Sequence, residues 1–146
     1  MIVGTDVLSA PVIACEPALK PMPSNLFPRT PLLNGTDARQ MRQTVRDYFH
    51  ATFDRYEQLF EVLTCDEAYY RKPITLRHPL IFYYGHTATF FINKLLLAGL
   101  ITERINPAFE SMCSVGVDEM SWDDLSDAHY DWPAVSELKA YRDAVR

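Results

Sequence analysis

Apolar residues recur in steps of three and four over a long stretch that begins near Asn34 and ends near Leu63. This spacing is typical of one face of an amphipathic helix, and Thr36 or Asn34 is expected to cap its first turn. The apolar stripe comprises Met41, Val45, Tyr48, Phe49, Phe53, Tyr56, Leu59, Phe60 and Leu63. Charged residues take the opposite positions, so the pattern predicts a helix with one buried and one solvated face.

Two further helices follow in the second half of the chain. One is expected to open at Pro79 and to run to about Leu100, with Gly99 as its C-terminal stop. It is apolar nearly all round, which is typical of a helix in the middle of a bundle. The other opens at Pro133, and its apolar stripe continues to the end of the sequence through Val135, Leu138, Tyr141 and Val145.

The pattern as a whole predicts an all-α protein in two parts. Residues 1–33 hold six of the ten prolines, which forbids helix there and predicts an extended leader. Residues 34–146 are expected to form the helical domain. Because three long helices, one of them apolar on all sides, need more partners than the chain supplies, we expect an incomplete four-helix bundle that is truncated at its C-terminus.

Composition and charge exclude several classes of partner. The net charge of −5 argues against a broad basic surface for nucleic acid or for an anionic membrane. The most apolar stretch, residues 80–101, contains His86, Asn93 and Lys94 near its middle, so a membrane span is not expected. Three widely spaced cysteines without a C-x-x-C pair argue against a disulfide framework or a zinc knuckle, and they favour a cytoplasmic location.

Histidines are the side chains with the clearest capacity for metal chemistry. No two of them lie three or four residues apart on one helix, as a local ligand pair requires. One lies well inside the second helix, on the face of Phe82 and Phe90, whereas another precedes Pro79 and is expected to cap that helix or to face solvent at its mouth. By spacing alone, a single histidine on an apolar helix is more typical of a hydrogen-bonded core residue than of a ligand. The four are His50, His78, His86 and His129.

The run L-R-H-P-L-I-F-Y-Y-G-H-T-A-T-F-F at residues 76–91 resembles the helical, DinB-like N-terminal domain of the sulfoxide synthases of thiol-histidine biosynthesis. The branch that makes ovothiol is the most similar. Further runs at residues 104–107, 115–124 and 129–133 resemble the same family, and the likeness extends over roughly residues 40–146. The ergothioneine branch shares only a shorter pattern, a proline-opened helix that ends in Gly-His.

The resemblance implies an enzyme that uses non-haem iron(II) and dioxygen to couple cysteine to the imidazole ring of histidine, forming a C–S bond and a sulfoxide. Three histidines hold the iron in that family, and the first, in the Gly-His pair, is His86 here. Gly85 beside it would let a neighbouring helix or the metal approach closely.

The remaining parts of such an enzyme do not occur in these 146 residues. The other two iron ligands belong to an H-x-x-x-H-x-E motif on a later helix, which is absent here. The domain that shapes the substrate pocket, similar to the formylglycine-generating enzyme, and the C-terminal methyltransferase are absent as well. We therefore expect the front part of the enzyme, with the downstream domains as its partners, cysteine, histidine and dioxygen as substrates of the complete protein, and no activity alone.

Two other functions remain open. A stand-alone DinB-like thiol transferase with a divalent metal would need His50 or His129 to complete a three-histidine site inside the chain. A non-catalytic helical module would instead bind another polypeptide through its unburied apolar stripe. Metal content separates either enzyme from the module.

Overall fold

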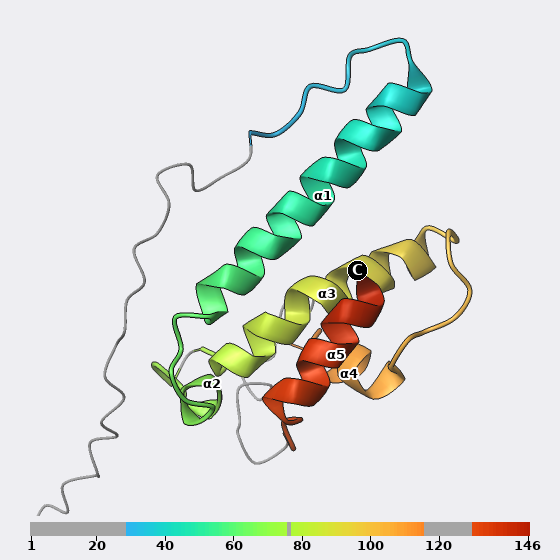
Figure 1. Ribbon diagram of the computed structural model, residues 1–146. Coiled ribbons are helices and arrows are strands. Elements are labelled where there is room, and N and C mark those ends of the chain that lie inside the picture. The colour runs from blue at the N-terminus through green and yellow to red at the C-terminus, as the bar shows by residue number, and fades with distance from the viewer. Residues whose placement is uncertain (1–28, 76, 116–129) are drawn as a thin grey trace, which may run out of the picture.

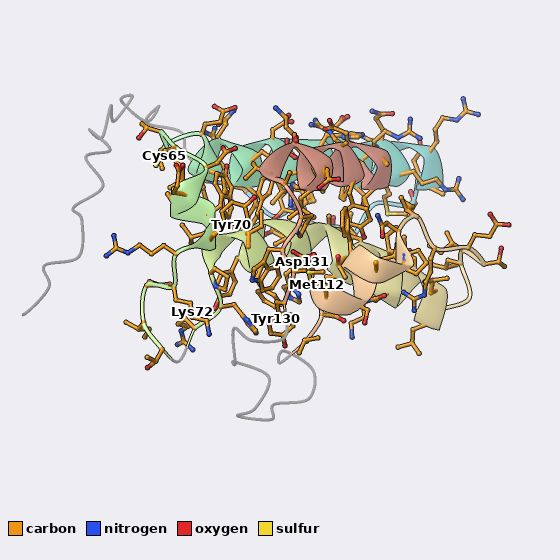
Figure 2. The ribbon with its side chains drawn as sticks, turned by 90° about the horizontal axis from the view of Figure 1, so that it is seen from below. Cys65, Tyr70, Lys72, Met112, Tyr130 and Asp131 are labelled. Atoms are coloured by element: carbon orange, nitrogen blue, oxygen red, sulfur yellow. The ribbon has the colours of Figure 1, made fainter. Side chains whose placement is uncertain are left out.

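The computed structural model describes residues 29–75, 77–115 and 130–146 (Figure 1). Within these ranges every regular element is a helix, which confirms the all-α prediction. Figure 2 shows α1 and α5 in one layer and α3 and α4 in a second. Residues 1–28 of the expected leader and residues 116–129 lie outside the described residues. The helices are α1 (Ala38–Phe60), α2 (Glu67–Tyr70), α3 (Leu80–Leu97), α4 (Pro107–Met112) and α5 (Val135–Val145).

The start of α1 differs by one residue from the predicted cap. Asp37 is the N-cap, and its carboxylate accepts hydrogen bonds from the backbone N–H groups of Arg39 at 2.8 Å and Gln40 at 3.2 Å. The prediction of Thr36 or Asn34 was wrong because the carboxylate of Asp37 is in reach of the free donors of the first turn. The helix buries Phe53 and Phe60, as its stripe predicts.

Helix α3 ends as predicted, at a glycine. Gly99 has φ +66°, a left-handed conformation that costs glycine little. The backbone N–H of Leu100 donates to the carbonyl of Leu95 at 2.9 Å, and that of Gly99 donates to the carbonyl of Leu96 at 3.0 Å. This pair of bonds is a Schellman motif.

Helix α3 packs against α2, α4 and α5, but it is not buried on all sides. Phe90 is 45% exposed and Phe91 is 38% exposed, so the prediction of a fully central helix was wrong for this face. The apolar stripe of α5 is instead better covered than the sequence suggests, since Leu138 and Tyr141 are buried in the core. The uncovered apolar surface therefore belongs to α1 and α3 rather than to α5.

The fully buried Arg142 of α5 joins three helices. Its Nε donates to Oε1 of Glu57 on α1 at 3.1 Å, and its Nη1 donates to Oγ1 of Thr87 on α3 at 2.8 Å. The guanidinium also lies 4.5 Å from the ring centroid of Phe53 and 4.6 Å from that of Tyr84. Ion pairing and aromatic contact together compensate for the burial of this cation.

Helix α4 was not predicted, and a buried carboxylate fixes the loop that leads into it. Glu110 is fully buried. Its carboxylate accepts hydrogen bonds from Nη1 of Arg104 and from the backbone N–H groups of Ile105 and Asn106, each at 2.9 Å. Asn106 caps the helix by accepting from the N–H of Phe109 at 3.1 Å. Asn93 connects this loop and α4 to α3: its Oδ1 accepts from Nη1 of Arg104 at 2.9 Å, and its Nδ2 donates to the carbonyl of Glu110 at 3.4 Å.

Two further observations bear on the sequence predictions. Cys113 is free and buried. Among the described helices, none is both long and apolar enough to cross a membrane.

Candidate metal centre

The imidazole of His86 is anchored by the backbone that follows α4. Nδ1 of His86 lies 2.8 Å from the carbonyl oxygen of Cys113. A carbonyl only accepts hydrogen bonds, so Nδ1 carries the proton and donates. The neutral ring then has its lone pair on Nε2.

This arrangement suits a metal ligand. Histidines that bind metals donate their other ring N–H to a carbonyl or a carboxylate, which fixes the tautomer and the orientation of the ring. No hydrogen bond joins Nε2 of His86 to any residue in the described ranges. The hydrogen bond at Nδ1 fixes the orientation of the ring. The side chain is half-buried, so it is not fully enclosed by the core.

Gly85 allows the close approach on which this anchor depends. A Cβ atom added at Gly85 would collide with Sγ of Cys113 and would lie 3.2 Å from both Cδ atoms of Leu138. Any larger residue would therefore push α4 and α5 away from α3. Of the two roles that the sequence suggested for this glycine, the structure shows the approach of neighbouring elements.

His78 is not the cap or solvent-facing residue that the sequence predicts. It is only 4% exposed, and its ring stacks on that of Phe82 with centroids 4.0 Å apart. Trp132 packs edge-on against His78 at 6.4 Å, and Pro79 takes the N-cap position of α3. The prediction failed because Trp132, which helps to cover His78, lies far away in sequence.

Phe82 links the two histidines of this helix. Its ring is nearly parallel to that of His86, with centroids 5.4 Å apart and an interplanar angle of 11°, and it also stacks on the ring of His78. Phe90 lies on the other side of His86 at 6.3 Å. Phe82 and Phe90 therefore flank His86, as the sequence pattern suggests. The ring of Tyr130 also packs against that of His78, with centroids 6.0 Å apart. Figure 2 shows Tyr130 on the side of α3 that faces away from α1.

Among the described residues, no other candidate ligand joins His86. Nδ1 of His50 on α1 accepts a hydrogen bond from Nε of Arg146 at 3.2 Å, and His129 lies outside the described residues. Within the described ranges, no group of three or more His, Cys, Asp or Glu residues could hold a metal ion. Since a catalytic metal needs about three protein ligands, His86 fits iron as one imidazole donor, and the described residues do not complete the coordination.

Cys113 contributes its carbonyl to this site and not its thiol. Burial raises the pKa of Cys113 to about 12, so the thiol stays protonated and is a poor metal ligand. Sequence reasoning missed this residue because a backbone acceptor leaves no signature in side-chain patterns. The Asn-Pro pair at 106–107 was the available signal for α4, since an Asn cap followed by proline is typical of a helix start.

Comparisons with known proteins agree with this helical architecture. No curated protein matches the chain. The DinB superfamily matches residues 48–146, a range that begins inside α1 and includes α2 to α5. This match covers more than half of the sequence, and the chain therefore belongs to the DinB superfamily.

Proposed function

We propose that this chain is the front domain of an iron(II)- and dioxygen-dependent sulfoxide synthase of the 5-histidylcysteine type, which joins cysteine to histidine in ovothiol biosynthesis, and that His86 is one of its iron ligands. The observation that carries the proposal is the hydrogen bond between His86 Nδ1 and the Cys113 carbonyl at 2.8 Å. It leaves Nε2 as a lone-pair donor at the position where the related sulfoxide synthases carry their first ligand. DinB-superfamily membership supplies the matching fold.

The residues of this chain supply orientation. The Cys113 carbonyl selects the tautomer of His86, Phe82 restricts the ring from one side, and Gly85 permits the approach that brings the carbonyl into range. Iron(II) held by three imidazoles offers open positions for a thiol and for dioxygen. Because the described residues hold no three-donor group, two further ligands must come from outside these residues.

The structure bears differently on the two alternatives, the stand-alone thiol transferase and the helical interaction module. A stand-alone thiol transferase needs a complete site within the chain, and no such group occurs in the described ranges. A helical interaction module needs an uncovered apolar surface, which α1 and α3 do provide. The module therefore stays as the second candidate.

Reconstitution tests the proposal. The chain would be joined to a polypeptide that carries an H-x-x-x-H-x-E helix and the pocket-forming domain, loaded anaerobically with iron(II), and given cysteine, histidine and air. We expect about one iron per protein and a product with the mass of the histidine–cysteine sulfoxide. His86→Ala should lose both, while His50→Ala, on another helix, should keep both. Wild-type iron content in His86→Ala would overturn the proposal.

A further inference from the structure

A long apolar seam on α1 is only partly covered by the described residues, since Phe49 alone of its members packs against the core. The positions follow one another in steps of three and four over about 20 Å of helix. Val45 is 44% exposed, and its neighbours on the seam are exposed or half-buried. The members of this seam are Ala38, Met41, Val45, Phe49 and Thr52.

Two hollows lie along this seam and share the side chains of Val45 and Phe49. One, of about 380 Å³, lies between α1 and α3, where the ring of Phe91 meets that of Phe49 edge-on at 5.1 Å. The other, of about 700 Å³, extends toward the start of α1, where Leu33 forms part of its wall. Together they form one open groove, called the α1 groove below, which is the shape that receives an amphipathic helix.

The charge on the α1 groove is basic, although the chain is acidic as a whole. Arg42 and Arg46 line the groove one helical turn apart, and both are exposed. Neither forms an ion pair or a hydrogen bond with any described residue. Residues 38–46 hold three arginines and no acidic residue, in a chain whose net charge is −5.

We propose that the α1 groove binds an acidic amphipathic helix that lies outside these 146 residues. The apolar side of that helix would cover Val45, Phe49 and Phe91, and its carboxylates would meet Arg42 and Arg46. Such flanking charges select the partner and its orientation, as they do beside the seam of a coiled coil. This inference goes beyond the proposed iron site and does not depend on His86.

The same charges disfavour a second copy of this chain in the groove. A two-fold contact centred on Val45 would bring Arg42 and Arg46 of both copies into one interface. Like charges held together at an interface are repulsive, and residues 38–46 provide no carboxylate to separate them.

The test uses a labelled synthetic helix of leucines at steps of three and four, flanked by glutamates, and a matched peptide in which lysines replace the glutamates. Fluorescence anisotropy measures the binding of each to the full chain. At low salt we expect the glutamate peptide to bind at least about tenfold more tightly than the lysine peptide, and we expect this preference to shrink as salt is raised. The double variant Arg42→Glu/Arg46→Glu should reverse the preference. Lys139→Glu, an exposed change of the same charge on α5, should leave it intact.

Two control measurements test whether the variants stay folded and whether the apolar contact contributes to binding. Circular dichroism should show unchanged helix content for the charge variants, since their side chains are exposed, and Val45→Asp should weaken the binding of both peptides. Equal binding of the two peptides, or a preference unchanged by the double variant, would overturn the proposal. So would sedimentation that shows self-association abolished by Val45→Asp, because the groove would then belong to a second copy.

Discussion

Gly85 and Cys113 approach so closely that a single added carbon at Gly85 would collide with the Cys113 sulfur. The residue after Gly85 is His86, and its Nδ1 donates to the carbonyl of Cys113. The absence of a side chain at Gly85 therefore allows Cys113 to come close enough for its carbonyl to accept the hydrogen bond from His86. Four predictions follow from this packing and from the buried polar groups around it.

Gly85→Ala should destabilise the fold and loosen His86. Alanine gains up to about 1 kcal/mol in helix propensity, but an overpacked core costs about 1–3 kcal/mol, and Cys113 and Leu138 leave no room. Urea denaturation measures the first effect, and the ring ¹⁵N shifts of His86 measure the second. Gly35→Ala is the matched control, because its Cβ would meet only Met41 at an ordinary 3.8 Å. A variant as stable as the wild type, with unchanged His86 shifts, would contradict the packing argument.

Arg142→Met should lower the free energy of unfolding by about 1.5–3 kcal/mol, since Glu57 loses its charged hydrogen-bond donor and keeps only Arg146 at 3.9 Å. It also removes the bond to Thr87 and the contact with the rings of Phe53 and Tyr84. Lys139→Met, an exposed change on the same helix, should have little effect. Thermal and urea unfolding of both variants check the difference, and comparable stability of the two would show that Arg142 does not tie the helices together.

Glu110→Ala should free the loop before α4. The N–H groups of Ile105 and Asn106 lose their acceptor, and Arg104 loses its ion-pair partner. Buried hydrogen bonds to a charged group contribute about 1.5–3 kcal/mol each, so we expect both amides to exchange with deuterium at least about tenfold faster. Unchanged protection at these two amides would mean that the carboxylate does not hold the loop.

Stability should fall at alkaline pH, beginning near pH 9. Burial raises the pKa of Cys113 from its ordinary 9.0 to about 12, and that of Tyr141 from 10.0 to about 12. Between these values the unfolded chain has released protons that the folded chain retains. The unfolded state thus binds fewer protons, and the free energy of unfolding decreases as pH rises, by up to about 1.4 kcal/mol per pH unit for each group.

Cys113→Ala separates the contribution of the thiol from that of the buried tyrosines, among which burial also raises the pKa of Tyr69 to about 12. It should remove the part of the decrease that begins near pH 9 and leave the part that begins near pH 10. Urea denaturation at a series of pH values from about 7 to 11 checks this, because that range includes the ordinary pKa values of thiols and phenols. An onset that stays at pH 9 in the variant would exclude the buried thiol as its cause.

The long helices were predictable because their periodicity extends over many residues. The stripe of α1 and the glycine stop of α3 need only local sequence, and the structure confirms both. Helices α2 and α4, of four and six residues, are too short for periodicity to distinguish them from loops.

The surroundings of the two histidines on α3 show what local sequence does not contain. His78 is buried by Phe82, one turn away, and by Trp132, far along the chain. The acceptor for His86 is a backbone carbonyl 27 residues later. Both depend on how α3 meets distant segments, and so neither could be predicted from spacing.

The most direct test of the central claim is ring-nitrogen NMR of ¹⁵N-histidine chain during titration with cobalt(II), a stand-in for iron(II). Before metal is added, we expect His86 to be the Nδ1–H tautomer, with the unprotonated shift at Nε2. During the titration, the resonances of His86 should be perturbed at lower metal concentration than those of His50, His78 and His129. A protonated Nε2 in the free chain, or perturbation of another histidine while His86 stays unchanged, would contradict the assignment of His86 as a metal ligand.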